Sequence, residues 1–522
     1  MDTKALRQKI LDLAIRGKLV PQDPSDEPAS VLLERIREQK KQMVKEGKLK
    51  AKDIKNDTII FVGEDNLHYE KFADGTVKCM EDEIPFEVPE GWEWTRLGSL
   101  FSTITGSTPS TKDASLYGDE YPFYKPTDLD AGFDVCFSED TVSEKGYKNG
   151  RILPVYSVLV TCIGATIGKT GYIRNSGICN QQINAILPNT FILPEYTYFC
   201  MCSEFEQQQI WTNSSATTLP ILNKSKFDSL FFPVPPKAQQ TRTVERIKEL
   251  LHFVEIIQQE KRTLQETIKL TKSKILDLAI RGKLVPQDPN DEPASVLLER
   301  IRAEKEELIK QGKIKRDKKE SIIFRGDDNS YYLRTGRVEE SLEDWRFDDL
   351  PETWKICCLG ELCDYGDCIN VNTEDIAEDA WILDLEDIEK DTGTVLKKVT
   401  KDQRNSVSTK HKFHSGQVLY SKLRPYLNKV VLSDADGYCT SEILPLEFKN
   451  CVLPEYARYY LMSGTFIAYA NHCSYGVKMP RLGTTDGKKA IFSLPPLSEQ
   501  KRIVETIDFC FVQLNKISEA LA

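Results

Sequence analysis

The segment 163–170, IGATIGKT, is the first stretch whose residue types could do chemistry, because it is similar to a phosphate-binding loop. That motif needs four residues between its glycines, and only three lie between Gly164 and Gly168. The sequence also shows no partner residue for hydrolysis beside it. We therefore favour a loop without a nucleotide over an NTPase site.

Other groupings with catalytic or metal-binding residue types are also weak. Cys357, Cys358, Cys363 and Cys368 gather ahead of two histidines, and we interpret them as buried free cysteines rather than zinc ligands. The acids upstream of Glu447-Phe448-Lys449 could be interpreted as a nuclease pattern, but patterns this short arise by chance. The tetrapeptides typical of amino-methyltransferases are missing from the sequence. The sequence therefore predicts a chain without a catalytic centre.

Two basic stretches indicate a different chemistry. Residues 145–194 contain five Lys and Arg and no acid, and residues 395–430 contain nine against Asp402 alone. Lys and Arg position a protein on phosphates, whereas Arg, Asn and Gln can read base edges. A solvated surface is the alternative for either stretch alone. The predicted DNA-contacting residues in these stretches are Lys145, Lys148, Arg151, Thr166, Lys169, Arg174, Gln181, Lys397, Lys398, Arg404, Lys410, Lys412, Ser421, Lys422, Arg424, Asn428 and Lys429. Ser107, Thr108 and Lys112 lie ahead of the first stretch and complete the predicted set.

The overall composition at first opposes nucleic-acid binding. The 522 residues carry 70 Lys and Arg against 80 Asp and Glu, a net charge of −10. Two segments hold most of the excess, with −9 over residues 56–93 and −6 over 327–353. No apolar run reaches the ~20 residues that a membrane span needs, and we find no signal peptide. Fourteen scattered cysteines suit a reducing compartment, so we expect a cytoplasmic protein.

An internal repeat organises these features. Residues 9–37 and 274–302 agree at 28 of 29 positions, the exception being Ser25 against Asn290, and weaker echoes continue to Pro235-Pro236 and Pro495-Pro496. The basic stretches lie at corresponding places but share little sequence. The exposed run KLVPQDP in both copies suggests one surface presented twice to one partner, although a structural or recombinational origin remains open. The predicted partner-binding residues are Lys18, Leu19, Val20, Pro21, Gln22, Lys283, Leu284, Val285, Pro286 and Gln287.

Apolar spacing predicts the helices that would position both stretches. Residues 237–281 have a coiled-coil seam, including Leu264, and Gly282 should end a rod of about 66 Å. Residues 503–521 continue the seam to Ile517 and Leu521, and residues 6–13 give a short counterpart. The two terminal helices would complete an antiparallel partner for the rod. A second helix in each copy should enter through Ser25 or Asn290 and bury Leu32, Leu33 and Ile36.

The doubled order of these motifs resembles the DNA-specificity subunit of type I restriction-modification enzymes. The carriers are the segments 91–98 and 106–109, the loop 163–169 with Asn180-Gln181, the segment 419–429 (LYSKLRPYLNK), and the prolines before each spacer helix. The resemblance covers essentially the whole chain. It implies an α+β fold with two globular mixed α/β target-recognition domains, separated by long antiparallel coiled-coil helices in a pseudo-two-fold internal repeat.

The domains expected from this resemblance follow the repeat. They are a repeated helical region with an acidic insertion (1–90), target-recognition domain 1 (91–235), a central spacer helix with the second repeated helical region (236–350), target-recognition domain 2 (351–495) and a C-terminal spacer helix (496–522). The acidic insertions depart from the shorter family pattern.

The resemblance also implies a function and partners. The chain would be non-catalytic and would read a bipartite DNA target, with the helices as a ruler. Two copies of a methyltransferase subunit that binds S-adenosylmethionine would dock on the repeat, joined by a restriction subunit that uses ATP and magnesium. The alternative is a protein-binding scaffold with two equivalent docking sites and no DNA readout.

Overall fold

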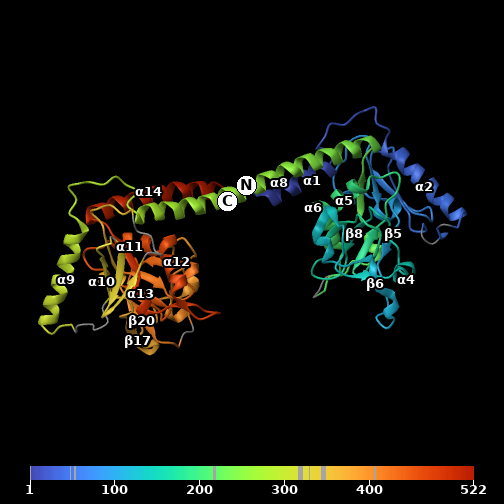
Figure 1. The fold of residues 1–522 in the computed structure, drawn as a ribbon. Coiled ribbons are helices and arrows are strands. Elements are labelled where there is room, and N and C mark those ends of the chain that lie inside the picture. Colours follow the sequence, from blue (N-terminus) through green and yellow to red (C-terminus); the bar gives the residue numbers. More distant parts are fainter. Residues whose placement is uncertain are drawn as a thin grey trace. The chain divides into compact units, whose positions relative to one another are not determined.

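The computed structural model describes residues 2–47, 49–51, 54–215, 219–314, 321–328, 330–342, 349–404 and 407–521. The chain divides into two compact units, Met1–Glu260 and Lys261–Ala522, and each contains one copy of the repeat (Figure 1). Asn329, part of one weaker sequence echo, lies outside the described residues. Each unit mixes helices with several small sheets, which agrees with the mixed α/β fold expected from the sequence.

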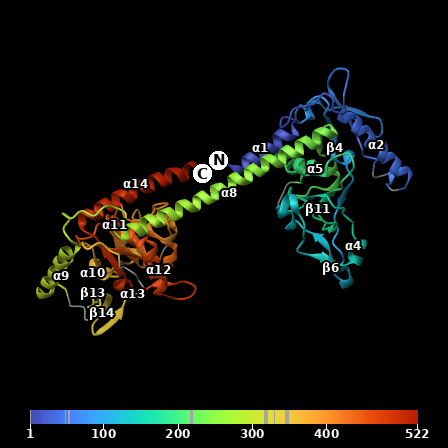
Figure 2. The ribbon, with the colours of Figure 1, turned by 45° about the horizontal axis from the view of Figure 1, so that its top comes forward.

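The helices that the apolar spacing predicts are present. Within the first unit, α1 (Thr3–Ile15) lies antiparallel beside the first part of α8 (Lys237–Ile280). Within the second unit, α14 (Leu497–Leu521) lies antiparallel beside the last part of α8 (Figures 1 and 2). α8 ends one residue before the predicted limit, and Gly282 follows with a φ of 66°. A residue without Cβ adopts this left-handed conformation at low cost, which explains the glycine at the helix end.

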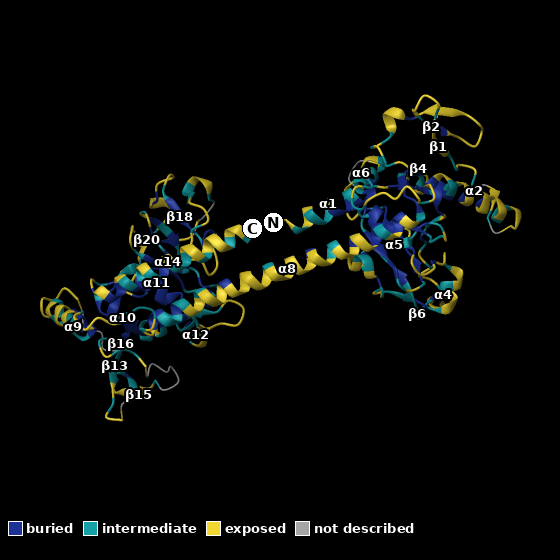
Figure 3. Cartoon of the chain, turned by 90° about the horizontal axis from the view of Figure 1, so that it is seen from above, coloured by how far each residue is buried: buried dark blue, intermediate teal, exposed yellow. Residues whose placement is uncertain are grey.

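The predicted apolar seam is wrong in two places. Leu264 is 40% exposed and Ile517 is 46% exposed, and between residues 255 and 267 no residue of α8 is buried (Figure 3). The buried part of α8 lies instead near its two ends, at residues such as Val244, Ile247 and Ile280. The apolar period of the sequence predicts a packing face along the whole helix. In the structure, other elements of each unit bury only the part of α8 that they contact.

The second helices begin later than predicted. α2 (Ala29–Lys45) and α9 (Ala294–Lys310) start directly after Pro28 and Pro293, so Ser25 and Asn290 are not N-caps. The backbone N–H of Ser25 donates to the carboxylate of Asp23 at 2.9 Å, which makes a turn before the helix. The expected buried face is largely correct: Leu32 and Ile36 are buried and Leu33 is half-buried.

The repeated polar residues attach each globular body to its helix. The Gln240 side chain accepts a hydrogen bond from the backbone N–H of Leu193 at 2.8 Å, and Gln500 accepts one from Leu453 at 2.8 Å. The Arg242 guanidinium pairs with Asp26, and Arg502 pairs with Asp291 in the second unit. These matching contacts give a structural reason for the sequence echoes around residues 193–196 and 453–456.

The first unit contains four small sheets among its described residues. Their strand orders are β1-β2-β3, β10-β6-β7, β5-β11-β8-β9 and β12-β4. The strands are β1 (Ile59–Val62), β2 (His68–Lys71), β3 (Val77–Cys79), β4 (Glu93–Arg96), β5 (Thr103–Thr105), β6 (Tyr117–Tyr124), β7 (Thr141–Val142), β8 (Val158–Thr161), β9 (Thr170–Tyr172), β10 (Ile178–Cys179), β11 (Ile183–Ile186) and β12 (Phe231–Val234). Its shorter helices are α3 (Leu97–Leu100), α4 (Glu144–Asn149), α5 (Pro194–Met201), α6 (Glu204–Asn213) and α7 (Lys224–Asp228).

The second unit repeats the framework and changes the periphery. Its described strands order as β13-β14-β15, β16-β27, β17-β20-β23-β18-β19, β22-β21-β24 and β25-β26. They are β13 (Ser321–Arg325), β14 (Tyr331–Thr335), β15 (Val338–Ser341), β16 (Lys355–Cys358), β17 (Ile369–Val371), β18 (Trp381–Leu383), β19 (Val399–Thr400), β20 (Lys410–Phe413), β21 (Val418–Ser421), β22 (Val430–Leu432), β23 (Gly437–Thr440), β24 (Ile443–Leu446), β25 (Ser474–Tyr475), β26 (Arg481–Leu482) and β27 (Ile491–Leu494). Its shorter helices are α10 (Leu359–Leu362), α11 (Pro454–Leu461), α12 (Gly464–His472) and α13 (Thr484–Lys489).

The central strand of each unit is buried on both faces. In β8, Val158 and Val160 join the core beneath the helices, whereas Leu159 points into a smaller core on the opposite face. In β21, Val418 and Leu419 divide in the same way. Side chains of a strand alternate between faces, so a strand covered on both sides reads as a continuous apolar run. The loop that follows this rigid strand is therefore held in place.

Candidate nucleic-acid interface

The loop that follows the central strand has the same backbone design in both units. It covers residues 162–169 between β8 and β9, and residues 422–429 between β21 and β22. The backbone N–H of Gly164 donates to the Pro220 carbonyl at 3.0 Å, and that of Arg424 donates to Pro480 at 2.7 Å. The segment that is similar to a phosphate loop and the segment KLRPYLNK are therefore one structural element. A constant offset of 260 residues relates them.

Two positions of this loop are left-handed in both units. Gly164 and Gly168 have φ values of 99° and 87°, and their equivalents Arg424 and Asn428 have 51° and 47°. Glycine adopts this conformation freely and asparagine tolerates it, but an arginine held there is strained. Strain kept at one residue indicates a role for its side chain.

Cations without acidic partners gather at the loop of the second unit. Within the described residues, the side chains of Lys422 and Arg424 make no hydrogen bond or ion pair, and the Arg424 Nε is buried without an acceptor. Arg481 lies beside this loop, because its backbone bridges to Leu423. Unlike the other two cations it has an acidic partner, since its guanidinium donates to both oxygens of Glu442 at 2.8–3.1 Å. Such an arrangement can bind phosphate or a base edge.

A hairpin with an apolar tip lies next to these cations. It consists of β25 and β26, and its tip residues Tyr475 and Val477 are 62% and 100% exposed. Its second strand carries Arg481. Sequence reasoning missed Glu442, Arg481, Tyr475 and Val477. Tyr475 and Val477 belong to the run YGVKM, which gains a meaning only from the loop beside it in space, and Glu442 and Arg481 lie outside that run.

The first unit presents amides and hydroxyls where the second presents cations. The Thr108 hydroxyl donates to the Gln181 side-chain oxygen at 2.5 Å, and the Ser107 backbone N–H donates to the Cys179 carbonyl at 2.8 Å. Arg151 is exposed and donates to the Thr105 carbonyl, which places it beside the same segment. The structure thus brings Ser107, Thr108, Arg151 and Gln181 together. Thr166 is exposed on the loop 162–169.

The basic stretches are not basic surfaces throughout. Acids outside the two stretches pair with most of their cations, so the stretches do not form two uniformly basic faces. In the first unit the pairs are Lys145–Asp113 at 3.1 Å, Lys148–Glu144 at 2.7 Å, Lys169–Asp130 at 2.7 Å and Arg174–Asp134 at 2.8 Å. In the second they are Lys397–Asp387 at 3.6 Å and Lys398–Asp434 at 2.7 Å. Lys112 and Lys412 are exposed, and their side chains have no partner among the described residues.

Several predicted contact residues of the second unit are interior. Lys410, Ser421 and Asn428 are buried. The Arg404 guanidinium lies against the buried Asp387 at 2.6 and 2.8 Å and against Asp384. Lys429 is half-buried and donates to the Leu385 carbonyl at 2.5 Å. Burial therefore contradicts the prediction that Lys410, Ser421 and Asn428 contact DNA, and Arg404 and Lys429 already have partners within the protein. In this structure Arg404 and Lys429 stabilise the loops behind the interface.

The predicted partner-binding run is only partly available at the surface. Lys18, Pro21 and Gln22 are exposed, as are Lys283, Pro286 and Gln287. Leu19, Leu284 and Val285 pack against the cores, and Val20 is half-buried. Gln22 accepts from the Trp92 indole N–H at 2.9 Å, whereas Trp354 donates to Glu499 at 2.9 Å. Part of the run is thus conserved between copies because it packs onto the following segment.

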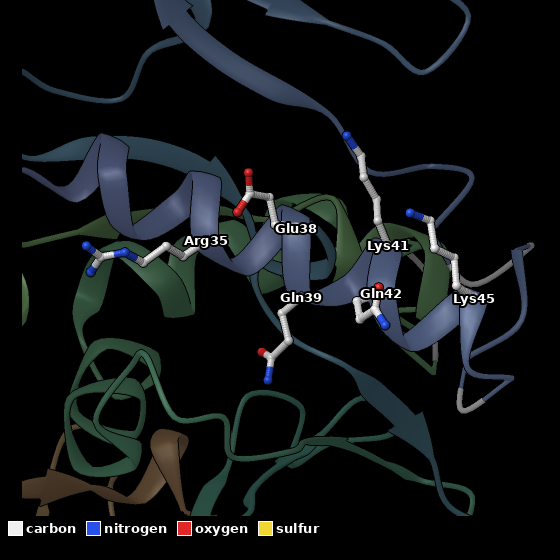
Figure 4. A pocket seen from close by; sticks show the side chains of 6 residues that line it. All are labelled: Arg35, Glu38, Gln39, Lys41, Gln42 and Lys45. Atoms are coloured by element: carbon white, nitrogen blue, oxygen red, sulfur yellow. The ribbon is translucent and has the colours of Figure 1, made fainter.

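The described residues show no candidate metal centre. They contain no cluster of three or more His, Cys, Asp or Glu that could hold a metal ion. Cys357 and Cys363 are buried free thiols, and burial raises the pKa of both. A hollow on α2 is lined by polar side chains that point in different directions (Figure 4). No described helix is both long and apolar enough to cross a membrane.

Comparison with known proteins identifies the family. The family described as "Type I restriction modification DNA specificity domain" matches residues 89–266 and again residues 351–520. The chain belongs to this family, as its sequence resemblance predicted. Two such domains in one chain fit recognition of a DNA target in two parts.

Related proteins cover nearly the whole chain. It is 27% identical to the type I restriction enzyme EcoAI specificity subunit of Escherichia coli, over 98% of this chain and 90% of that protein. It is 26% identical to the EcoEI specificity subunit of the same species, over 99% and 90%. A solved structure described as "Structural basis underlying complex assembly and conformational transition of the type I R-M system" aligns with a TM-score of 0.54 at 16% identity. That alignment covers 84% of this chain and 94% of the other, and it supports the fold.

Proposed function

We propose that this chain reads a bipartite, asymmetric DNA target, with one half-site for each globular body, residues 91–235 and 351–495. The observation that carries the proposal is the loop shared by both units, which has one backbone design and two different side-chain chemistries. In the first unit the loop itself carries the exposed Thr166, and Thr108 and Gln181 lie on neighbouring segments where their polar groups suit a base edge. In the second unit Arg424 on the loop suits guanine or phosphate. Different donors on one scaffold are what two different half-sites require.

The chain acts without chemistry of its own in this proposal. Two copies of a modification subunit, which binds S-adenosylmethionine and methylates adenine, dock on the repeated regions. A restriction subunit that uses ATP and magnesium joins them in the cytoplasm. The near identity of residues 9–37 and 274–302, beside recognition bodies that differ, supports one partner bound twice.

The helices α1, α8 and α14 serve as the ruler between half-sites. The antiparallel pairs α1–α8 and α14–α8, each within its own unit, support an antiparallel coiled coil with pseudo-two-fold symmetry. α8 has no internal Pro or Gly over its 44 residues, so it should transmit a fixed length.

An exchange of recognition bodies tests this function. Residues 91–235 are replaced by those of a family member with another target, and the methylated positions in host DNA are sequenced. We expect one half of the methylated site to change and the other half and the spacing to stay. The proposal is wrong if the whole target stays the same.

The rival is a protein scaffold without DNA readout. A gel shift of the assembled complex on duplex DNA separates the two, since the scaffold predicts no retardation. Retardation that is stronger on the methylated target than on a scrambled duplex supports DNA reading.

A further inference from the structure

The hairpin of β25 and β26 is anchored to the loop that follows the central strand, which we call the shared loop. Two backbone hydrogen bonds join them in the second unit. The Arg424 N–H donates to the Pro480 carbonyl at 2.7 Å, and the Leu482 N–H donates to the Lys422 carbonyl at 3.0 Å. The backbone therefore fixes the position of the hairpin relative to the loop.

The first unit has the same two contacts 260 residues earlier. The Gly164 N–H donates to the Pro220 carbonyl at 3.0 Å, and the Leu222 N–H donates to the Cys162 carbonyl at 2.8 Å. Both anchoring contacts thus belong to the internal repeat, and Pro220 is the equivalent of Pro480.

An exposed apolar residue stands directly before this proline in both units. Leu219 is 54% exposed and Met479 is 44% exposed. Proline has a fixed φ, and the residue before a proline is restricted to an extended conformation. In the first unit the side chain lies beside the shared loop, because a Cβ at position 164 would be 3.9 Å from the Leu219 Cδ1. Each apolar side chain is therefore presented from a rigid backbone position next to the loop.

The second unit adds further apolar surface and positive charge around Met479. Tyr475 and Val477 of the same hairpin are 62% and 100% exposed. The side chains of Lys422 and Arg424, on the adjoining loop, have no acidic partner among the described residues. Apolar side chains next to unpaired cations fit duplex DNA, which is anionic along its backbone and apolar between its stacked bases.

The two units keep the residue type at this position, although the shared loop changes around it. Loop positions 164 and 166 are Gly and Thr in the first unit, and their equivalents 424 and 426 are Arg and Tyr. A side chain that reads a base edge or a thymine methyl should differ between two different half-sites. Leucine and methionine are instead typical of apolar wedges, which enter between two base pairs and require only that the step unstacks. The similar residues at positions 219 and 479 therefore favour a wedge over a base-specific contact.

We propose that Leu219 and Met479 are wedges, each of which enters one base step of its half-site and unstacks it. This inference rests on the proposed function, in which each globular body covers one half-site. The free energy of unstacking depends on the step, and pyrimidine–purine steps deform most easily. Each wedge thus selects a deformable step and contributes to specificity without a hydrogen bond to a base.

Base stacking in the assembled complex tests the proposal. The duplex carries the target found by sequencing the methylated positions. 2-Aminopurine replaces one adenine at a time in or beside the half-sites, except the methylated adenine and its neighbours, and its fluorescence rises where bases unstack. We expect a rise at one step of each half-site. Leu219→Ala should abolish it in one half-site alone and Met479→Ala in the other alone, each with about tenfold weaker binding.

Matched variants separate insertion from a general loss of apolar surface. Leu67→Ala and Val338→Ala also shorten exposed apolar side chains, 37% and 60% exposed, away from the shared loop. They should leave both fluorescence signals and the affinity unchanged. Leu219→Met and Met479→Leu exchange the two wedge residues and should keep the rise in both half-sites.

Several results would overturn the inference. One is a fluorescence rise that persists in both alanine variants, and another is target binding by the unaltered complex without any rise. A third is weaker binding that thymine-to-uracil replacement in the DNA reproduces, which would indicate a methyl contact. A fourth is loss of a protein subunit from the alanine variants in native mass spectrometry, which would assign the hairpin to a protein contact. If the unaltered complex does not bind the target duplex, the proposed function itself fails, and this differs from binding without unstacking.

Discussion

At the scale of single residues, the shared loop explains why its sequence was difficult to interpret. Its left-handed positions are Gly164 and Gly168 in one copy but Arg424 and Asn428 in the other. The first copy of the loop is similar in sequence to a glycine-rich phosphate loop, and the second is a basic segment. Sequence motifs alone therefore indicate two unrelated elements. Only the backbone hydrogen bonds, which connect each loop to residues some 20 and 60 positions away, reveal one element.

Replacing Arg424 by glycine separates strain from recognition. Arg424→Gly relieves the left-handed conformation, which offsets the extra freedom of glycine in the unfolded chain, so we expect the free energy of unfolding to change by less than about 1 kcal/mol. DNA affinity of the assembled complex should fall by about 1–3 kcal/mol if the guanidinium reads a base. Thermal unfolding and fluorescence anisotropy measure the two quantities.

The matched control is Asn428→Gly in the same loop. It removes the other left-handed side chain, which is buried, so DNA affinity should stay unchanged. Equal loss of affinity in both variants would mean that the loop conformation, rather than the Arg424 side chain, determines binding.

The sequence also could not predict which cations stay unpaired at the surface, for a related reason. Residues 145–194 lack acids, yet Asp113, Asp130 and Asp134 approach their cations from other elements. A run of like charges shows only the local composition of the sequence. Whether its cations form ion pairs depends on which acid-bearing loops the fold places beside them. Lys422 and Arg424 belong to the run, but Arg481 does not, because its neighbours Leu423 and Glu442 lie about 60 and 39 residues away in the sequence.

At the scale of elements, the long helices were predictable and the small sheets were not. The end of α8 and the start of α14 follow from local signals, namely a glycine and a Pro-Pro pair. The three-stranded sheets β1-β2-β3 and β13-β14-β15 have strands of three to five residues with few buried side chains. Neither apolar periodicity nor composition therefore predicts them from the sequence. Leu264 is an error in the other direction, because the sequence predicts a buried residue that is in fact exposed. The apolar period continues there although the helix has no packing partner at this position.

A heptad deletion in α8 tests the ruler. Removing residues 257–263, none of which is buried, takes away two turns and shortens the helix by about 10 Å while it turns the following face by only about 20°. At 3.4 Å per base pair this corresponds to a spacer about three base pairs shorter. Sequencing of the methylated sites should show both half-sites unchanged at the new spacing.

The control replaces the same seven residues by another helix-forming heptad. This variant keeps the length, so the original spacing should remain. An unchanged spacing in the deletion variant would show that α8 does not determine the distance between the half-sites.

At the scale of the whole molecule, the repeat separates what is shared from what is specific. The shared part contains the helices, the three-stranded sheets β1-β2-β3 and β13-β14-β15, and the central strands with the following loop. The specific part is peripheral, a three-stranded sheet around β6 in one unit and a five-stranded sheet around β18 in the other. In the proposed function, DNA is read where the specific part meets the shared loop.

The net charge of −10 predicts weak DNA binding by the chain alone. Within the described residues, only Lys112, Lys412, Lys422 and Arg424 among the predicted cations have side chains without a partner in the protein. Each phosphate contact contributes about −0.9 to the slope of log affinity against log salt, so the chain alone should give a slope no steeper than about −4. Fluorescence anisotropy from 50 to 200 mM salt measures it. The proposed function predicts that the complex with a modification subunit binds more tightly with a steeper slope, through cations that the partner would add. Equal slopes for chain and complex would place all phosphate contacts on this chain and contradict the shared interface.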